Sequence, residues 1–161
     1  MMKRMGLFAL ILVGLLLVVR FSGLWDSLLP AGPISEVDFA TLSPPGSPNT
    51  YLVCPEGVCA GATPDAVSPQ TQLPPAQLIE RIVAIAEADG AAQVERIGSD
   101  AVEMVVRTPL MRWPDRVSVR AYPLASADGS TFALYSRSKY GESDMGANKK
   151  RVERWIAQLK P

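Results

Sequence analysis

The fold is decided by residues 101–139, AVEMVVRTPLMRWPDRVSVRAYPLASADGSTFALYSRSK. Apolar and polar residues alternate along this stretch, and a two-residue period is typical of a half-buried β-strand. The alternation predicts strands at about 101–107, 116–122 and 131–139, which prolines and the Asp128-Gly129 turn separate. Because the connections between these strands are short, we expect consecutive strands to pair antiparallel.

Residues on either side of this stretch extend the pattern. A fourth strand is expected over 92–97, just before the Gly98-Ser99-Asp100 turn. A helix begins at Pro74-Pro75 and stops at Gly90, because proline suits the first helical positions and glycine the C-terminal end. The last helix has apolar residues at i, i+3, i+4 and i+7, namely Val152, Trp155, Ile156 and Leu159. The sequence therefore predicts an α+β fold, a two-layer domain in which an antiparallel β-meander of about four strands carries two helices on one face.

The N-terminus carries a long apolar segment. Lys3 and Arg4 precede an uninterrupted apolar run over 5–19, and Trp25 follows. The run alone spans roughly 22 Å, which is short of the roughly 30 Å hydrocarbon core, but a helix that continues to Trp25 is long enough. We therefore expect an uncleaved signal anchor, a transmembrane helix, over 1–25. A cleaved signal peptide and a buried helix of the domain are the alternatives.

Charge sets the expected orientation of this helix. Basic residues flank its N-terminal side, whereas residues 21–80 contain no lysine or arginine. By the positive-inside rule, the N-terminus lies in the cytoplasm and the rest of the chain outside. The expected location is the inner (plasma) membrane, with a periplasmic or other extracytoplasmic domain.

The segment 26–48 is expected to be a proline-rich tether that leads to a domain over 49–161. Five of its residues are prolines, which keep a chain extended. An ordered arm that packs along the domain is the alternative, because the segment also contains apolar residues. These are Ile34, Val37, Phe39 and Leu42.

The two cysteines, Cys54 and Cys59, lie in the part of the chain expected outside the cytoplasm, where disulfides persist. A bridge between them closes a six-residue ring, and the proline and glycine inside it suit a tight turn. We expect a structural disulfide; two free thiols and a redox role are the alternatives. A redox role is disfavoured because active dithiols use the closer Cys-x-x-Cys spacing.

Composition excludes several kinds of chemistry. The chain of 161 residues has no histidine, which rules out histidine-based acid–base catalysis and histidine metal ligands. Two cysteines are too few for a zinc or iron–sulfur site, so we expect neither a metal nor a cofactor. After residue 25 the chain has 13 basic and 16 acidic residues, a net charge of −3, so we expect no nucleic-acid partner for this extracytoplasmic part. The Ser136-x-x-Lys139 pattern of serine acylases falls in an expected strand rather than on a helix, so no catalytic residue is assigned.

The expected sheet has a polar face rich in arginine and tyrosine. Arginine forks bind carboxylates and phosphates and stack on aromatic rings. This face suits an envelope protein or an anionic envelope polymer, although cross-strand pairs on a solvated face explain the same residues. The residues of this candidate partner face are Arg107, Arg116, Arg120, Tyr122, Tyr135 and Arg137.

The segment 138–152 carries the most specific motif of the chain, and its matching residues are Ser138, Gly141, Ser143, Asp144, Gly146, Asn148 and Arg151. It resembles the end of an uncharacterised family catalogued as domain of unknown function 1499, with the pattern Ser-Arg-x-Gly-x-Ser-Asp-x-Gly-x-Asn-x-x-Arg. Lys139 stands where that family has arginine. Trp113-Pro114-Asp115-Arg116-Val117 is similar to a looser aromatic-x-Asp-Asp-Val motif, and Pro48-Asn49 to a Pro-Asn-Cys start. The resemblance covers about residues 47–159 and implies no reaction.

The same motif allows two interpretations. Ser143 and Asp144 can cap the last helix, or the N–H groups at the helix start can bind an anion beside the basic stretch 149–151. The candidate ligand-binding residues are Asp115, Ser138, Lys139, Ser143, Asp144, Asn148 and Arg151.

The sequence leaves two functional hypotheses. The favoured hypothesis is a non-catalytic, membrane-tethered extracytoplasmic module with a binding or structural role in the cell envelope. The alternative is an enzyme or a binder of a small anionic ligand, with its site around Asp115, Ser138, Asp144 and Asn148. A cleft over buried acids favours the alternative, whereas a flat arginine- and tyrosine-rich sheet face favours the first.

Overall fold

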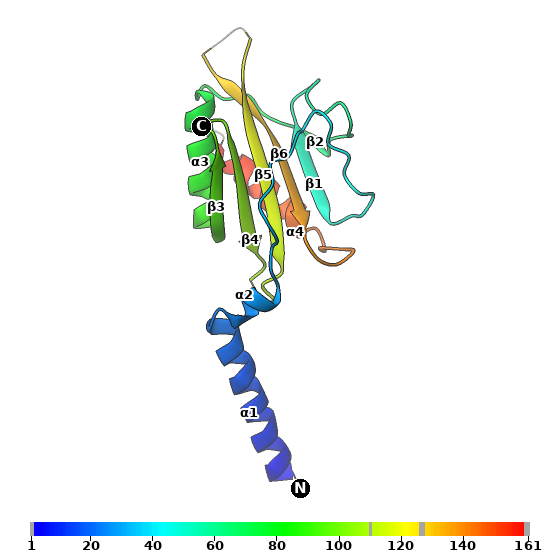
Figure 1. The fold of residues 1–161 in the computed structure, drawn as a ribbon, viewed down its shortest axis with the longest axis vertical. Helices are drawn as coiled ribbons and strands as arrows, with labels where there is room; N and C mark the ends of the chain where they lie inside the picture. The colour runs from blue at the N-terminus through cyan, green and yellow to red at the C-terminus, as the bar shows by residue number, and fades with distance from the viewer. Residues whose placement is uncertain (1, 110, 126–127, 160–161) are drawn as a thin grey trace. The chain divides into compact units, whose positions relative to one another are not determined.

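The computed structural model describes residues 2–109, 111–125 and 128–159, and the chain divides into two compact units after Pro30. The first unit contains two helices, α1 (Met2–Phe21) and α2 (Leu24–Leu28). The second contains a β-sheet, two further helices and long connections without regular structure (Figure 1).

The expected transmembrane helix over 1–25 is wrong. In the described part of the chain, no helix combines the length and the apolar character needed to cross a membrane. The expectation depended on one helix continuing to residue 25, but α1 ends at Phe21, and Gly23 turns the chain with a φ of 77° before α2 begins. Glycine adopts this left-handed conformation without steric cost. The break therefore separates Trp25 from the apolar run.

The second unit is built on a mixed sheet of six strands in the order β2-β1-β6-β5-β4-β3. The strands β3 to β6 pair antiparallel with their neighbours in the chain. Strand β1 pairs antiparallel with β6, and β2 pairs parallel with β1. The expected fold class, an antiparallel meander of about four strands, is therefore wrong. The strands are β1 (Thr50–Cys54), β2 (Ala66–Val67), β3 (Ala91–Ile97), β4 (Ala101–Arg107), β5 (Pro114–Pro123) and β6 (Ser130–Ser138).

Strand β1 lacks the sequence pattern that reveals the other strands. All of its residues after Thr50 are buried, because one side packs in the helix-covered core and the other packs with Phe39. A strand covered on both faces has no polar face and shows no alternation. Its pairing joins Leu52 to Tyr135, two residues far apart in the chain, so no local pattern reports it.

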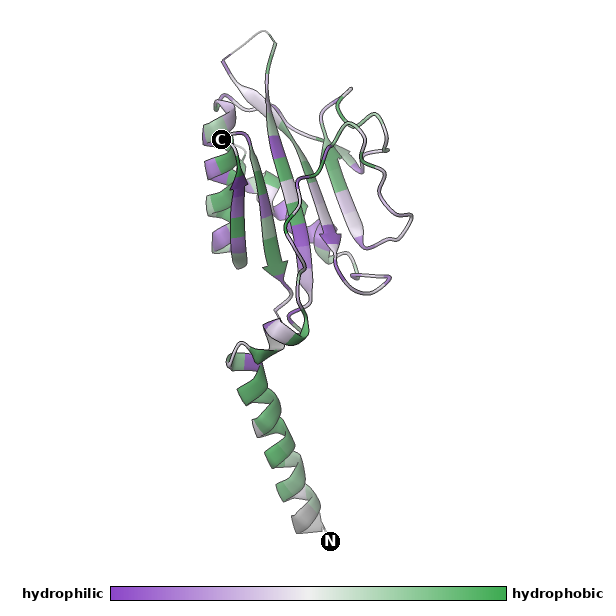
Figure 2. Ribbon diagram, in the orientation of Figure 1, coloured by the Kyte–Doolittle hydropathy of each residue, from purple (hydrophilic) through white to green (hydrophobic). Residues whose placement is uncertain are grey.

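Helices α3 (Pro75–Ala88) and α4 (Ala147–Leu159) cover one face of the sheet, behind it in the view of Figure 1. Apolar residues of both helices form one core with alternate residues of β4, β5 and β6, and Figure 2 shows the alternation as green and purple bands along β5. The Trp155 indole N–H also donates to Asp89 Oδ2 at 2.8 Å, which ties α4 to the end of α3.

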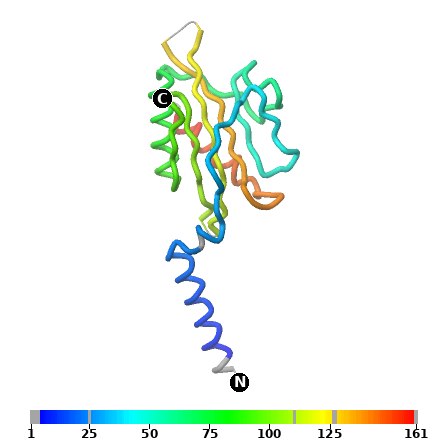
Figure 3. The backbone as a smooth tube through the Cα atoms, viewed as in Figure 1, coloured from blue at the N-terminus to red at the C-terminus, as the bar shows by residue number. Residues whose placement is uncertain are grey.

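The opposite face of the sheet is covered by the chain itself. Residues 31–42, here called the arm, cross it without helix or strand (Figure 3). Phe39 of the arm is 2% exposed and packs with Leu52, Ala133 and Tyr135 of β1 and β6. The strands β4, β5 and β6 are therefore largely buried on both faces, by the two helices on one side and by the arm on the other, whereas β3 has no buried residue.

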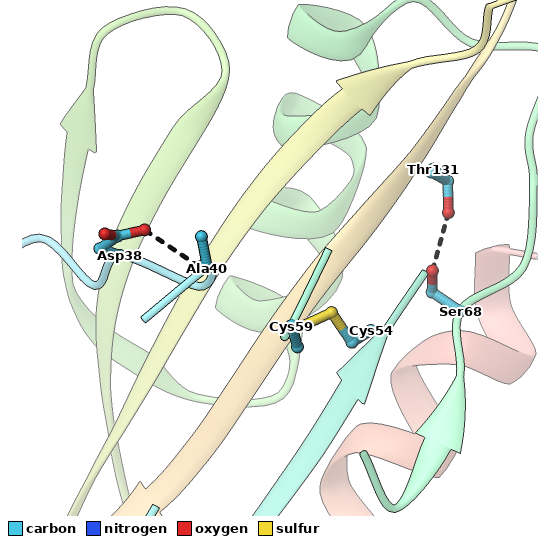
Figure 4. Close-up of a disulfide and its surroundings, with 6 residues drawn as sticks. All are labelled: Asp38, Ala40, Cys54, Cys59, Ser68 and Thr131. Carbon is cyan, nitrogen blue, oxygen red and sulfur yellow. Dashed lines mark hydrogen bonds between the residues drawn. A yellow bond between two sulfur atoms is a disulfide. The ribbon is translucent and has the colours of Figure 1, made fainter. Parts of the chain in front are cut away.

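The expected disulfide between Cys54 and Cys59 is confirmed. Both cysteines are buried in the same cluster as Phe39 (Figure 4). In the arm, Asp38 accepts hydrogen bonds from the Thr41 hydroxyl at 2.9 Å and from the Ala40 N–H at 3.0 Å. These bonds lower the pKa of Asp38 and close the turn that places Phe39 on the sheet.

Candidate ligand-binding site

Asp115 and Ser138 lie side by side on neighbouring strands. Asp115 is near the start of β5, Ser138 ends β6, and the two residues are paired in the sheet register. The Ser138 hydroxyl donates to Asp115 Oδ1 at 2.7 Å. Asp115 is 1% exposed, so its carboxylate needs strong partners in the protein interior.

Arg151 of α4 supplies the opposite charge. Its Nη2 donates to Asp115 Oδ2 at 2.6 Å, and both side chains are almost fully buried. Its Nη1 donates to Asn148 Oδ1 at 2.8 Å and to Ser136 Oγ at 3.2 Å. Because loss of either ionic partner leaves an uncompensated buried charge, this pair holds α4 and β5 in one arrangement.

Asn148 joins the helix to three other segments. Its Nδ2 donates to Asp144 Oδ2 at 2.7 Å, to the Asn49 carbonyl at 2.9 Å and to Ser138 Oγ at 3.1 Å. Its Oδ1 accepts from Ser136 Oγ at 2.5 Å as well as from Arg151. The buried amide is therefore fully engaged in bonds within the protein.

Asp144 caps the start of α4. Its Oδ1 accepts from the Gly146 N–H at 2.9 Å, and its Oδ2 accepts from the Asn148 N–H at 2.7 Å. The Met145 N–H donates to Ser143 Oγ at 3.3 Å, and the Ala147 N–H donates to the Asp144 carbonyl at 3.0 Å. The amides of residues 145–148 are thus all engaged. The geometry supports the capping interpretation of the motif rather than an anion site at this helix start.

Asn49 also belongs to this network, although it is not among the candidate site residues that the sequence predicts. Its carbonyl accepts from the N–H of Ser138 at 3.0 Å and from Asn148. Its own Nδ2 donates to the Gly141 carbonyl at 2.6 Å, and its Oδ1 accepts from the Ser47 hydroxyl at 2.6 Å. In the sequence, only the Pro48-Asn49 pair points to this residue. The pair fits the family pattern but predicts no local structure.

A cavity of about 730 Å³ opens beside this network, and we call it the motif cavity. It lies where the β4–β5 connection faces the segment between β6 and α4. Its size is in the range of small-molecule binding sites, which are mainly apolar with a few polar groups. The described residues that line it are Thr108, Pro109, Met111, Trp113, Asp115, Ser138, Tyr140, Gly141, Ser143, Asp144, Met145 and Ala147.

Aromatic and thioether side chains form much of the wall. The rings of Trp113 and Tyr140 lie 5.9 Å apart, centroid to centroid, and are tilted by 52°. Met111 is exposed, and Met145 is 91% exposed. The sequence indicates Trp113 only as part of a loose motif, and it does not indicate the two methionines or Tyr140, because none of these residues has a local pattern that marks a binding site.

The backbone beside the cavity contains two strained residues. Arg112 has a φ of 51° and Met145 a φ of 54°, and in the described ranges these are the residues other than glycine with a positive φ. A side chain makes this conformation costly, and such residues concentrate at functional sites. One lies in each of the two segments that form the cavity wall, so the strain and the cavity occur together.

The other two candidate ligand-binding residues are Ser143 and Lys139. Ser143 lines the motif cavity. Lys139 is exposed and is not among the lining residues; its backbone N–H donates to the Pro114 carbonyl at 3.1 Å, and its side chain lies near Gly32. The structure thus brings together Asp115, Ser138, Asp144, Asn148 and Arg151 of the candidate set.

The candidate partner face is arranged differently from a solvated surface. Glu103, which is fully buried, accepts from Arg116 Nε at 2.9 Å and from Arg137 Nη2 at 3.2 Å. Its other oxygen accepts from the Ser118 hydroxyl. Arg116 Nη1 donates to the Pro33 carbonyl at 2.6 Å, so the arm closes over this cluster.

The remaining residues of this face are also engaged. Arg120 pairs with Glu36 of the arm, and Arg107 Nη1 donates to the Arg112 carbonyl at 3.0 Å. Burial raises the pKa of Tyr135 and of Tyr122. Burial also lowers the pKa of Arg137, and the charge of Glu103 opposes this shift. Arg137 lies over the ring of Tyr135 at 5.0 Å, so arginine and tyrosine pair within the chain.

Both acids at the cavity are engaged in bonds within the protein. Asp115 is bonded to Arg151 and Ser138, and Asp144 is bonded to helix amides. A general base must reach the proton that it removes, and a nucleophile needs an activating base. The Ser138 hydroxyl donates to Asp115 Oδ1, but Arg151 is paired with the same carboxylate, and both oxygens of Asp144 accept from amides at the start of α4. This arrangement suits the binding of a ligand, because bonded polar side chains form the floor of the cavity and apolar side chains form its walls.

Comparison with known proteins identifies the family. A search of curated proteins gives no match. The family model described as protein of unknown function (DUF1499) matches residues 43–159, a range that contains the whole bonded network and the motif cavity. The match confirms the resemblance drawn from the motif, and the chain belongs to this family.

Proposed function

We propose that this protein is a non-catalytic binding module of the cell envelope, and that it holds a small ligand with an apolar body in the motif cavity. One observation carries the proposal. Residues of the family motif form the polar floor of a cavity of about 730 Å³ whose walls include two aromatic and two thioether side chains. The two strained residues beside it support the same site.

The location of the proposed function rests on the disulfide. Cys54 and Cys59 form a bridge, and structural disulfides persist in oxidising compartments outside the cytoplasm. This favours an extracytoplasmic compartment.

Two other surfaces are weaker candidates. The arginine- and tyrosine-rich face supports an envelope partner less well, because the arm covers Arg116 and Tyr135. A second cavity of about 850 Å³ lies beside α3 and α4, with Arg81 and Gln158 on its wall. It contains none of the motif residues, so the motif gives no reason to place the function there.

The test is a titration of the full chain with 1-octanol, followed by NMR. Burial contributes about 0.8 kcal/mol per methylene, so we expect a dissociation constant below about 1 mM. The amide signals of Trp113 and Tyr140 should shift. The variant Ala147→Phe, which fills the motif cavity from the start of α4, should abolish these shifts, whereas Gln72→Phe at the second cavity should not. Shifts confined to Gln72 and its neighbours would refute the proposed site.

A further inference from the structure

We propose, on the basis of the function proposed above, that the ligand of the motif cavity is an organic cation, an ammonium group attached to an apolar chain. The first argument is the charge of the wall. Asp115 and Asp144 are the charged side chains among the described lining residues, and no lysine or arginine lines the cavity. The balancing cation Arg151 lies behind the floor, where its guanidinium is bonded to Asp115, Asn148 and Ser136.

The hydrogen-bonding capacity of the residues on the cavity floor also favours a cation. The Ser138 hydroxyl hydrogen is used on Asp115, and the amides of residues 145–148 are engaged. Each carboxylate oxygen has two lone pairs. Within the described part of the chain, Asp115 Oδ2 and Asp144 Oδ1 each accept one hydrogen bond. These carboxylate oxygens can therefore accept further hydrogen bonds, which favours a ligand that donates hydrogen bonds or carries a positive charge.

The helix start excludes the opposite class of ligand. The N-terminus of a helix ordinarily attracts anions, because its amides and dipole are positive. In this chain Asp144 occupies that position with its own carboxylate. An anionic ligand would have to replace this intramolecular cap and would meet the carboxylate of Asp144, so an anion is the wrong partner for this cavity.

The aromatic corner supplies a site for the cationic head. Trp113 and Tyr140 present two tilted rings, 5.9 Å apart, on the cavity wall. Ammonium groups bind over the faces of tryptophan and tyrosine, and quaternary ammonium ligands are recognised by pairs of such rings. Met111 and Met145 extend the wall with flexible apolar side chains, which adapt to an alkyl chain.

The experiment compares three probes that share one tail: octyltrimethylammonium, 1-octanol and octyl sulfate, each titrated calorimetrically into the full chain. The cation should bind on the order of 10-fold more tightly than the alcohol, because a desolvated cation–π contact adds to the same tail burial. Octyl sulfate should bind more weakly than the alcohol. Because α1 also exposes apolar side chains, binding to Ala147→Phe is measured as the background and subtracted.

Variants of Trp113 distinguish the contribution of the ligand's head group to affinity from that of its tail. Trp113→Leu should remove the preference for the cation while octanol still binds, and Trp113→Phe should keep part of that preference. Equal affinity for the cation and the alcohol would overturn the cationic ligand while leaving the proposed binding module intact. Tighter binding of octyl sulfate would overturn it as well. If none of the three probes binds above the Ala147→Phe background, both proposals fail.

Discussion

Arg151 is the buried member of a basic run on α4. It ends the run Lys149-Lys150-Arg151, which has the composition of a solvated basic surface. In the helix, Lys149 and Lys150 are exposed, whereas Arg151 is 5% exposed and paired with Asp115. Successive helical residues point in directions about 100° apart, so adjacent residues of like charge reach opposite environments.

At this scale we predict the effect of Arg151→Ala. Asp115 stays buried without its cation, and the free energy of unfolding should fall by about 3 to 5 kcal/mol. Urea unfolding measures the change. Lys149→Ala is the matched control on the same helix, because its pair with Glu153 is exposed and 3.9 Å long; its effect should be small. Equal losses in the two variants would contradict the role given to the buried pair.

Among the elements, the arm has the least regular structure and a large effect on the sheet. It contributes no strand or helix over residues 31–42, yet it contacts Arg116 through the Pro33 carbonyl and Arg120 through Glu36. Phe39 is its apolar anchor. The polar face of β5 and β6 is therefore an interior surface, which explains why a fully buried Glu103 has three partners there.

At this scale we predict the effect of Phe39→Ala. Removal of a buried phenylalanine leaves a cavity and should lower the free energy of unfolding by about 3 kcal/mol. The exposed Val67 provides the control, and Val67→Ala should change stability little. Hydrogen exchange at the arm amides adds a second measurement, since loss of the anchor should increase their exchange. A Phe39→Ala protein as stable as Val67→Ala would show that the arm adds no stability.

For the molecule as a whole, the burial of tyrosines makes the stability of the folded protein depend on pH in the alkaline range. Tyr51, Tyr122 and Tyr135 all have a pKa raised mainly by burial, because the folded protein disfavours the charged phenolate. Their unfolded pKa is about 10. Below that pH neither state loses the proton, so stability is unaffected. Above it, the unfolded chain releases protons that the folded protein retains, and stability falls.

We therefore predict that the thermal unfolding midpoint declines as pH rises above about 10. Differential scanning calorimetry between neutral and alkaline pH measures the decline. Tyr135→Phe removes one of the titrating groups, so the decline of this variant should be shallower than that of the natural sequence. Lysines titrate in the same range, but they are identical in the two proteins and cancel in the comparison. A steeper decline in Tyr135→Phe would refute the prediction.

Several features were predictable because they depend on neighbours in the chain. The family membership followed from the motif at 138–151, where residue identities at fixed spacing are specific. The disulfide followed from two cysteines five residues apart, a separation that a turn can close. The cap on α4 followed from Asp144, since an aspartate at a helix start bonds to amides two to four residues away.

The features that were wrong or missed depend on residues distant in the chain. Strand β1 was missed because its partner Tyr135 is remote and because burial on both faces removes alternation. The expected transmembrane helix is an exception, because it was wrong for a local reason: the backbone conformation at Gly23 separates α1 from α2. Trp113 and Tyr140 meet only because β5 and β6 are neighbours in the sheet.

Periodicity and spacing are local properties of a chain. The amino-acid sequence alone therefore predicts the alternating faces of β4, β5 and β6, the two amphipathic helices and the motif of the family. The folded chain adds two more strands to the sheet, buries Glu103 under the arm, and brings Asp115, Asn148 and Arg151 together beneath a cavity. The physical reason is that these contacts join residues far apart in the chain. Their free energies depend on burial and charge pairing, which come into existence only when the chain is folded.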